Sequence, residues 1–221
     1  MKDILIIANG TVHKELLSRI YPGYGHIICA DGGARYALEM GISPHLVVGD
    51  LDSLDEEYRD LLLKGSYNLD LHPVKKDATD LELALERAAA LKPPSIDILG
   101  GWGGRWDHSL INLHLLARYT TPQLRVQMLD PQHRVQAAVP GTLASIRGEP
   151  GDIVSLIPLS PRVKGVTARG FSYPLRDREL LFGSTLPVSN ALVGRVGQVL
   201  VTAGTLLIIH HFAEFRSPDG L

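Results

Sequence analysis

Hydrophobic positions in the first part of the chain form short continuous runs, and these runs alternate with segments in which apolar residues recur every three to four positions. The runs predict strands, and the segments between them predict helices. Strands are predicted at Ile4–Ala8, His26–Ala30, Leu46–Gly49, Leu69–His72, Ile96–Leu99 and Arg125–Leu129, and helices at Glu15–Ile20, Ala34–Met40, Glu56–Lys64, Asp80–Leu91 and His108–Tyr119. Because continuous apolar strands separated by helices are typical of a parallel sheet buried on both faces, residues 1–130 are predicted to form a mostly parallel α/β domain.

The pattern changes after about residue 130, where the helical periodicity stops. Turn-forming pairs such as Pro140-Gly141 and Pro150-Gly151 separate short β-rich segments. Predicted strands here include Asp152–Pro158, Leu186–Val188, Gln198–Thr202 and Thr205–His210. Because this spacing is typical of an antiparallel sandwich or barrel, residues 131–221 are predicted to form a second, β-rich domain.

Composition narrows the class of protein without naming an activity. The 221 residues are 45% hydrophobic and 21% charged, with a formal net charge of −2, which excludes disordered and fibrous classes. Without a positive net charge, no nucleic-acid partner is expected. Residues 1–122 carry 12 basic and 17 acidic side chains, a net charge of −5, whereas the remainder carries 10 basic and 7 acidic side chains, a net charge of +3. This asymmetry agrees with two domains.

Neither a membrane nor an oxidising compartment is indicated by the sequence. No apolar run approaches the ~20 residues that span a bilayer, and the N-terminal segment lacks the pattern of a cleavable signal, so no membrane partner is expected. The single cysteine, Cys29, can form no internal disulfide and is predicted to be a buried strand residue. A cytoplasmic location is expected.

Two carboxylates follow the predicted strand Leu46–Gly49. Asp50 and Asp52 are two residues apart, so in an extended chain both side chains point the same way. Adjacent carboxylates repel one another unless a cation lies between them, and oxygen ligands at a strand end suit Mg²⁺. The alternative interpretation is a simple turn, which Asp, Gly and Ser also favour.

A third acidic segment opens the longest predicted helix. Thr79 and Glu82 have the spacing of a capping box, and Asp80 in the first turn interacts favourably with the helix dipole, so each has a structural interpretation. Asp77 precedes the cap and lies with Asp80 at the same predicted sheet edge as the first two carboxylates. A shared phosphate–metal site is the functional alternative.

The neighbouring lysines, Lys75 and Lys76, are open to two interpretations. They could supply positive charge to a phosphate at that edge, or they could form part of a solvated face.

A glycine-rich loop follows the predicted strand Ile96–Leu99. It contains Gly100, Gly101, Gly103 and Gly104. Glycines let backbone N–H groups approach a ligand, and the following helix N-terminus favours anions, so the loop predicts phosphate binding. Arg105 is a candidate for stabilising charge on a transferring phosphate, because a guanidinium contacts two oxygens at once. His108 is a candidate base, with a hydrogen bond at the helix start as the alternative.

The loop Asp31-Gly32-Gly33 repeats the arrangement, since it again connects an apolar strand to a helix through glycines. Neither the P-loop motif nor the glycine spacing of a dinucleotide fold is present. Paired acids for glycoside hydrolysis are a weaker alternative, because no aromatic cluster for sugar stacking is seen and the glycines would go unexplained. The glycine-bearing strand ends and the acidic helix start together predict a phosphate–metal site at one sheet edge.

These segments, taken in order, resemble the thiamine pyrophosphokinase (thiamine diphosphokinase) family. The resemblance rests on Asp31-Gly-Gly-Ala, Gly49-Asp-Leu-Asp-Ser, Lys76-Asp-Ala-Thr-Asp, Gly100-Gly-Trp-Gly-Gly-Arg-Trp-Asp-His and Val188-Ser-Asn190, and it covers nearly the whole chain. It implies an α/β, Rossmann-like catalytic domain over residues 1–130 that binds ATP and Mg²⁺. It also implies a C-terminal antiparallel β-sandwich over residues 131–221 that binds thiamine and forms a homodimer. The implied reaction transfers pyrophosphate from ATP to thiamine and gives thiamine diphosphate and AMP.

The resemblance also implies roles for single residues. Asp50, Asp52 and Asp80 would hold Mg²⁺ and act in catalysis with Arg105 and Asp107. The loop residues Asp31, Gly32, Gly33, Asp77, Gly100, Gly101, Gly103 and Gly104 would contact ATP. Thiamine would contact Asp107, and it would contact Ser189 and Asn190 of the other subunit, so that active sites are shared in the homodimer.

Two features keep other functions open. Residues 186–197 contain no aromatic side chain to stack on thiamine, and Ala191 stands where an acidic residue is common in bacterial relatives. The alternatives are a pyrophosphokinase for another alcohol, such as a pterin, and a nucleotide-binding sensor that catalyses nothing. A complete set of charged groups at the predicted site argues against the sensor.

Overall fold

The structure, a computed structural model, describes residues 2–212 and contains two compact units, Met1–Leu115 and Leu116–Leu221. Helix α5, Trp106–Tyr119, begins in the first unit and ends in the second.

The first unit contains a parallel sheet with the strand order β5-β1-β2-β3-β4. Its strands are β1 Ile4–Ile7, β2 His26–Ala30, β3 Leu46–Gly49, β4 Leu69–Leu71 and β5 Ser95–Leu99, and its helices are α1 Lys14–Ile20, α2 Gly33–Glu39, α3 Glu56–Lys64 and α4 Asp80–Ala90, with a 3-10 turn at Tyr21–Gly23. Strands β1 and β5 are buried along their whole length, as expected for a sheet covered on both faces. The predicted parallel α/β architecture is confirmed.

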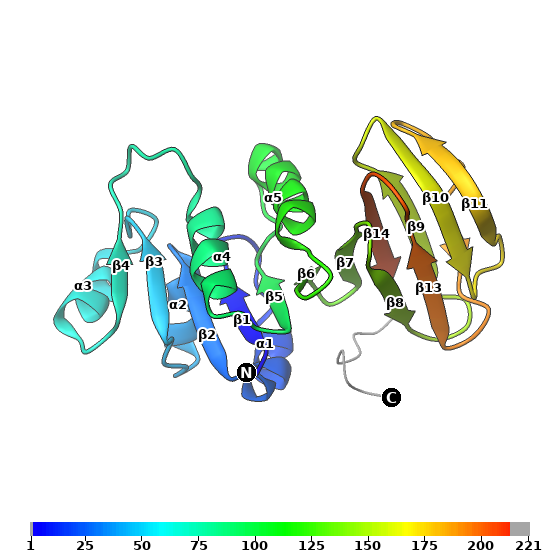
Figure 1. The fold of residues 1–221 in the computed structure, drawn as a ribbon. Helices are drawn as coiled ribbons and strands as arrows, with labels where there is room; N and C mark the ends of the chain where they lie inside the picture. The colour runs from blue at the N-terminus through cyan, green and yellow to red at the C-terminus, as the bar shows by residue number, and fades with distance from the viewer. Residues whose placement is uncertain (1, 213–221) are drawn as a thin grey trace. The chain divides into compact units, whose positions relative to one another are not determined.

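Helices cover both faces of this sheet. Helix α4 packs over β1, β2 and β3, and α2 packs against β1 and β2. Figure 1 shows α4 in front of the sheet and α2 behind it. Strand β2 carries Cys29, which is fully buried, so burial raises the pKa of its thiol and the sequence prediction for this residue is confirmed.

The strand order places a topological switch point at β1. The chain proceeds from β1 through β2 and β3 to β4 on one side, and then returns to place β5 on the other side of β1. The loops after β1 and β5 therefore leave the sheet next to each other, and ligands of open parallel sheets bind at such points.

Helix α4 begins with a side-chain cap. The hydroxyl oxygen of Thr79 accepts a hydrogen bond from the Glu82 backbone N–H at 3.2 Å, as the capping-box spacing predicts. The cap satisfies one of the free N–H groups at the start of the helix and fixes where Asp80 leaves the loop.

Replacing Thr79 with alanine should lower the free energy of unfolding by about 1 kcal/mol, because the cap is lost while the rest of the helix is unchanged. Urea denaturation followed by circular dichroism measures this. Thr79→Ser is the matched control, since serine caps as well as threonine does. Equal losses in both variants would contradict a capping role.

The second unit is a sandwich of two antiparallel sheets, with the strand orders β12-β9-β14-β7-β6 and β11-β10-β13-β8. The strands are β6 Arg125–Leu129, β7 His133–Ala138, β8 Leu143–Arg147, β9 Ile153–Pro158, β10 Arg162–Arg169, β11 Leu175–Leu181, β12 Asn190–Ala191, β13 Val196–Leu200 and β14 Leu206–His211. Buried side chains from both sheets, such as Val154 and Ile208 from one and Val166 and Val199 from the other, form one core. The predicted β-sandwich is confirmed.

One predicted strand of this unit is wrong. Leu186–Val188 forms a turn, in which the Val188 N–H donates to the Thr185 carbonyl at 3.1 Å. Pro187 has no N–H to donate to a neighbouring strand, and its carbonyl accepts one hydrogen bond, from the Leu156 N–H. Strand β6 belongs to the second unit, where it pairs antiparallel with β7, although it precedes the predicted domain boundary at residues 130/131. That boundary stays a prediction.

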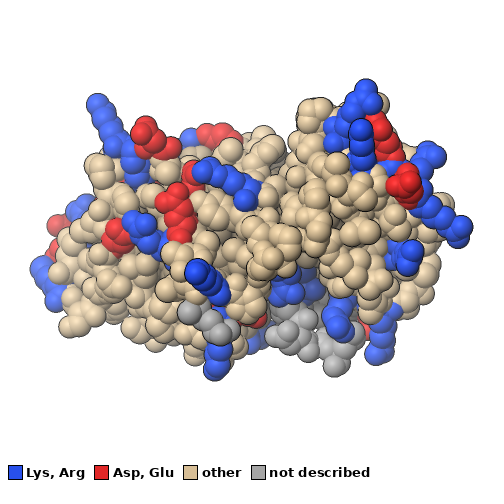
Figure 2. Space-filling view, in the orientation of Figure 1, with Lys and Arg blue, Asp and Glu red and all other residues tan. Residues whose placement is uncertain are grey.

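Charged side chains of both signs are mixed on the outer strands of the sandwich. Exposed residues along β11 alternate between basic and acidic, from Arg176 to Glu179, and Glu179 pairs with Arg162 of β10 at 2.8 Å. Figure 2 shows the blue and red side chains together over these strands. Among the helices of residues 2–212, none is long and apolar enough to cross a membrane. The cytoplasmic location stays a prediction.

Candidate active site

A cleft of about 690 Å³ lies at the carboxyl edge of the parallel sheet in the first unit. Its walls come from the segments that follow each of the strands β1 to β5, and from the beginnings of α4 and α5. The predicted site residues that line it are Asp31, Asp50, Asp52, Asp80, Gly100, Gly101, Gly103, Gly104 and Arg105; the candidates Lys76 and His108 line it as well. The predicted segments, far apart in sequence, thus meet at one place.

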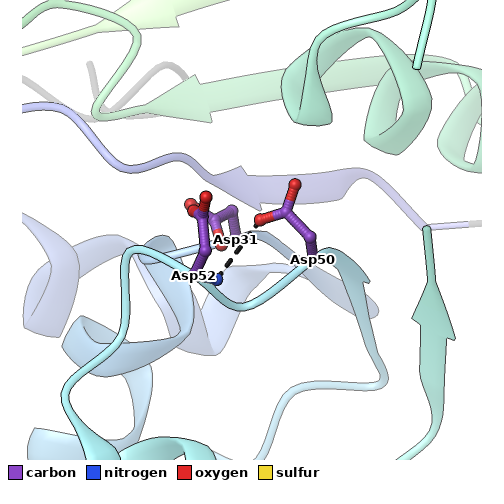
Figure 3. A group of neighbouring side chains, drawn as sticks. All are labelled: Asp31, Asp50 and Asp52. Atoms are coloured by element: carbon purple, nitrogen blue, oxygen red, sulfur yellow. Dashed lines mark hydrogen bonds between the residues drawn. The ribbon is translucent and has the colours of Figure 1, made fainter. Parts of the chain in front are cut away.

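Three carboxylates form a group at this edge. One oxygen each of Asp31, Asp50 and Asp52 lies within 4.8 Å of the other two. Figure 3 shows the Asp31 and Asp52 side chains close together, with one oxygen of Asp50 turned toward them, and marks the hydrogen bond from the Asp52 N–H to Asp50 Oδ1 at 3.2 Å. Three acidic side chains at such distances repel one another unless positive charge is supplied.

The surroundings of Asp31 fit a cation ligand. Asp31 is 5% exposed, and no group in residues 2–212 forms a hydrogen bond with its Oδ1 atom. Its φ of 47° is in the left-handed region, which non-glycine residues adopt rarely and which functional sites often contain. A buried carboxylate oxygen without a donor is costly, so this oxygen and those of Asp50 and Asp52 fit a hard divalent cation such as Mg²⁺.

The acidities of Asp50 and Asp52 are linked. Burial alone would raise the pKa of Asp50, but hydrogen bonds from Lys76 and Asp52 outweigh that effect and lower its pKa. The pKa of Asp52 is raised, first by hydrogen bonding with Asp50, then by burial and by the negative charges of Asp50 and Asp31. Asp50 therefore ionises before Asp52.

Lys76 lies between two of the predicted metal ligands. Its Nζ atom is 2.6 Å from Asp50 Oδ2 and 2.9 Å from Asp80 Oδ1, and its side chain is 12% exposed. Burial would lower the pKa of Lys76, but the two carboxylates more than offset this and raise it, so the ammonium stays charged. Of the two lysines left open by the sequence, Lys76 belongs to the site, whereas Lys75 is exposed.

The glycine-rich loop is joined to the loop after β1. The Gly10 N–H donates to the Gly100 carbonyl at 2.9 Å, and the Thr11 N–H donates to the Trp102 carbonyl at 2.6 Å. A Cβ at Gly10 would lie 1.9 Å from the Trp102 oxygen, and Gly100, with a φ of 71°, would place one 2.4 Å from the Ala8 oxygen. These two glycines are therefore required by the close approach of the loops, whatever ligand binds there.

Helix α5 fixes the rest of this loop. Asn112 donates from its amide to the Gly101 carbonyl at 2.9 Å. The Ser109 hydroxyl oxygen accepts from the Gly103 N–H at 3.3 Å and donates to the Arg105 carbonyl at 3.1 Å. The loop is thus anchored by its backbone at both ends, while Arg105 extends from it into solvent.

Arg105 and Asp107 form a two-pronged ion pair. Arg105 Nε and Nη2 donate to the two oxygens of Asp107 at 3.1 and 2.5 Å. Both side chains are largely exposed, at 71% and 64%. Hydrogen bonds from Arg105 and from the His108 backbone hold the pKa of Asp107 at about 2, so this carboxyl is ionised throughout the neutral range.

Three of the predicted ATP-contacting residues, Gly32, Gly33 and Asp77, do not line the cleft. Gly32 and Gly33 are buried, and a Cβ on Gly33 would lie 2.1 Å from the Ile7 carbonyl oxygen, so they permit the close packing of α2 on β1. Asp77 is exposed beside the cap of α4. The ATP contacts of all three stay predictions.

The predicted thiamine residues lie in the second unit. Ser189 is exposed, and its φ is 58°. Asn190 is 4% exposed, and its side chain holds the backbone of Tyr173: its Oδ1 accepts from the Tyr173 N–H at 2.9 Å, and its Nδ2 donates to the Tyr173 carbonyl at 2.7 Å. Tyr173 is 73% exposed. Asn190 therefore holds the backbone of an exposed aromatic residue that lies outside residues 186–197.

Two parts of the cleft were missed by sequence reasoning. The first is the loop Asn9–Thr11 after β1, which lines the cleft; the Asn9-Gly10 pair is a turn signal that could have indicated it. The second is the pair Ser109 and Asn112, which no sequence signal distinguishes from ordinary polar residues of a helix.

Two protein-family models match different parts of the chain. The family described as "Thiamin pyrophosphokinase, catalytic domain" matches residues 20–128, and the family described as "Thiamin pyrophosphokinase, vitamin B1 binding domain" matches residues 143–206. The first match contains the carboxylate group and the glycine-rich loop, and the second contains Tyr173 and Asn190.

Individual proteins agree with these matches. The chain is 35% identical to the thiamine pyrophosphokinase of Bacillus subtilis over 213 residues, which are 95% of this chain and 98% of that protein. It is 27% identical to thiamin pyrophosphokinase 1 of Caenorhabditis elegans over 75% of this chain and 68% of that protein. The crystal structure of the Bacillus subtilis enzyme superimposes with a TM-score of 0.83 at 32% identity, covering 95% of this chain and 99% of that one.

A second crystal structure, of the thiamin pyrophosphokinase from Geobacillus thermodenitrificans, superimposes with a TM-score of 0.81 at 30% identity and covers 99% of this chain and 100% of that one. Both units of the fold therefore have counterparts in each of these structures.

Proposed function

Since the chain belongs to the thiamin pyrophosphokinase family of transferases, we propose that its cleft binds ATP with Mg²⁺ and that its product nucleotide is AMP. The observation that carries this proposal is the group of three carboxylates beside a loop that bears Arg105. Phosphoryl transfer requires mainly alignment and charge neutralisation from a protein, and the cleft offers groups for both.

Asp31, Asp50 and Asp52 are the residues that would hold Mg²⁺, with Asp80 next to them across Lys76. Bound there, the ion would neutralise charge on the phosphate oxygens and orient them. Asp31 is included among these ligands because its buried Oδ1 atom has no hydrogen-bond donor. The sequence resemblance implied only that Asp31 contacts ATP.

Arg105 would bind the phosphates that are transferred. Its guanidinium is exposed and is held in one plane by Asp107, ready to exchange a carboxylate for phosphate oxygens of similar geometry. With a pKa of about 2, Asp107 is a poor proton acceptor, so we assign it to orienting Arg105 rather than to acting as a general base.

In the proposed reaction, one bond to the β-phosphorus of ATP forms and another breaks. The hydroxyl oxygen of thiamine forms a bond to the β-phosphorus of ATP, and the bond from that phosphorus to the oxygen bridging it to the α-phosphorus breaks. AMP leaves with the bridging oxygen and its electron pair, and the hydroxyl proton is released. Thiamine diphosphate is the other product.

A single assay tests this function. The protein is incubated with ATP, Mg²⁺ and thiamine, and the nucleotides are separated by chromatography. We expect equal amounts of AMP and thiamine diphosphate, and no turnover when a chelator removes the divalent ions. ADP as the nucleotide product, or turnover with a pterin alcohol but not with thiamine, would overturn the proposal.

Thiamine contacts are proposed for the second unit, in a homodimer with shared active sites. Support comes from the vitamin B1 binding match and from exposed apolar side chains near Ser189 and Asn190, namely Tyr173, Leu186, Val188 and Val193. Exposed apolar groups gathered in one region are typical of a binding surface. Tyr173 supplies the aromatic face on which the rings of thiamine would stack.

Shared sites make a prediction about mixed dimers. Asp52→Asn damages the carboxylate group, and Tyr173→Ala removes the aromatic face, so each variant alone should turn over thiamine poorly at low thiamine concentration. Mixed dimers contain one site with neither change. Random mixing should therefore restore about a quarter of the parent activity, because half of the dimers are mixed and each has one of two sites intact. No recovery in isolated mixed dimers would mean that each site is built within one subunit.

A further inference from the structure

We propose that the second unit contains a site for a divalent transition-metal ion such as Zn²⁺, formed by His133 and His211 and oriented by Asp130. The site lies at one end of the sandwich, where the turn between β6 and β7 meets the end of β14. Its residues belong to the second unit, whereas all members of the carboxylate group belong to the first.

The backbone fixes both histidines side by side. His133 and His211 are direct partners in the antiparallel pairing of β7 with β14. The Asp130 N–H donates to the His133 carbonyl at 3.0 Å, and one residue beyond β14 the Phe212 N–H donates to the Gln132 carbonyl at 2.9 Å. The two imidazoles are therefore held together by strand register and not by a chance meeting of flexible loops.

Their ring nitrogens face each other at a distance that suits one shared ion. His133 Nε2 and His211 Nδ1 are joined by a hydrogen bond of 3.1 Å. Two nitrogens that are each ~2.0–2.1 Å from one ion lie about 2.9 Å apart at a right angle and about 3.3 Å apart at the tetrahedral angle. The observed separation falls between these values, so an ion could replace the shared proton, which His211 can carry on its other ring nitrogen.

Asp130 prepares His133 for this role. Its oxygens lie 3.0 Å from His133 Nδ1, and Oδ1 also accepts the N–H groups of Gln132 and His133 at 2.7 Å, so the carboxylate is fixed by its own turn. A proton on Nδ1 that is shared with Asp130 leaves the lone pair on Nε2, facing His211. Metal-binding histidines are typically oriented by a carboxylate in this way.

The ligand type selects the ion. Neutral imidazole suits Zn²⁺, Ni²⁺ and Cu²⁺, whereas Mg²⁺ prefers oxygen. His211 is exposed and the His133 side chain is 37% exposed, so an ion held by two nitrogens has room for water or another ligand in its remaining positions. Bound metal would tie the β6–β7 turn to the end of β14.

A second histidine pair in the chain lacks these features and is a natural control. The rings of His26 and His45 have their centroids 4.3 Å apart and are tilted by 33°. His45 Nδ1 already accepts the Ile27 N–H at 3.1 Å. If the closeness of two histidines were enough, this pair would bind an ion as well as the proposed site does. It differs because one nitrogen of His45 already accepts a backbone hydrogen bond.

The test is Zn²⁺ titration of the full chain against a chromophoric chelator, with millimolar Mg²⁺ present and in the Asp52→Asn background, so that binding to the carboxylate group is reduced and equal in all samples. His133→Gln and His211→Gln should each weaken the competing Zn²⁺ site at least 10-fold. Asp130→Asn, which can keep the turn hydrogen bonds, should weaken it roughly 10–100-fold. His45→Gln should change nothing.

A spectroscopic measurement identifies the ligands independently. Cu²⁺ added at one equivalent should give an electron paramagnetic resonance spectrum with splitting from two nitrogens, reduced to one in either histidine variant. Zn²⁺ binding of equal strength in parent and histidine variants, or absence of any Zn²⁺ binding that these variants remove, would overturn the proposal. An unchanged affinity in Asp130→Asn would overturn the role of Asp130. None of these readouts depends on turnover, so the result is independent of the proposed function.

Discussion

Replacing Asp52 with asparagine is expected to lower the turnover number by at least about 100-fold. Loss of a residue that only orients a metal ligand already costs about 10–100-fold, and Asp52 is itself proposed as a ligand. Asparagine keeps the size of the side chain but removes one negative charge from the group that it forms with Asp31 and Asp50. Steady-state kinetics over a range of Mg²⁺ concentrations measures the effect. We expect both a lower turnover and a higher Mg²⁺ requirement.

The same variant should not lose stability, and this separates a functional defect from a folding defect. The pKa of Asp52 is raised in the folded protein by hydrogen bonding with Asp50, by burial and by neighbouring negative charge. A carboxyl whose pKa is raised on folding stabilises the protein below its unfolded pKa of about 3.9, and this contribution is lost as pH rises through the folded pKa. At neutral pH, in the absence of divalent ions, Asp52→Asn should therefore melt at the same temperature as the parent or higher.

The melting difference should shrink toward zero when the pH is lowered well below the unfolded pKa of about 3.9, where the Asp52 carboxyl is neutral in folded and unfolded chains alike. Asp55→Asn is the matched control: Asp55 is an exposed acid three residues away, and its side chain makes no capping hydrogen bond. If Asp52→Asn kept full activity and an unchanged Mg²⁺ requirement, Asp52 would not be a ligand at the proposed metal site.

Replacing Arg105 with alanine is expected to lower kcat/KM by about 100- to 1,000-fold, the usual cost of removing one group that stabilises developing charge. Arg105→Lys should recover little of this loss, because an ammonium cannot contact two phosphate oxygens in one plane. Arg59→Ala, which removes an exposed arginine from α3, is the control for a general effect of charge.

Asp107→Asn distinguishes the two assignments of this carboxylate. If Asp107 orients Arg105, asparagine should lower kcat/KM less than Arg105→Ala does, and the pH profile should keep its shape above pH 4, since a pKa of about 2 places no titration of Asp107 there. A loss as large as that of Arg105→Ala would instead indicate that Asp107 contacts the thiamine hydroxyl or the metal directly.

The parallel sheet could be predicted because its strands are continuous apolar runs between helices. His26–Ala30 and Leu46–Gly49 are strands with the predicted bounds. The sandwich is harder to predict from sequence, because its outer strands carry charge. Strand β11, Leu175–Leu181, has four consecutive exposed charged residues and no alternation that would indicate a strand. The apolar segment Leu186–Val188 has a strand-like composition but contains a proline within a turn.

The edge on which the site lies could also be predicted, since each acidic or glycine-bearing segment follows a strand. The pairing of side chains within it could not. Asp31 joins Asp50 and Asp52 through a left-handed backbone conformation, and Lys76 reaches two carboxylates from different segments. Tyr173 was missed because the interaction that presents it, with Asn190, spans 17 residues along the chain.

Lys76 gives the acidic edge a counter-ion that is part of the chain. An ion from solution can be diluted, chelated or exchanged, whereas an ammonium on its own side chain stays at the same effective concentration under all these conditions. The carboxylates Asp50 and Asp80 thus remain partly neutralised whether or not substrate is present. If the cleft binds a divalent ion with a nucleotide, as proposed, the Lys76 ammonium could move from carboxylate to phosphate oxygens, and the charges would stay balanced without refolding of the loop.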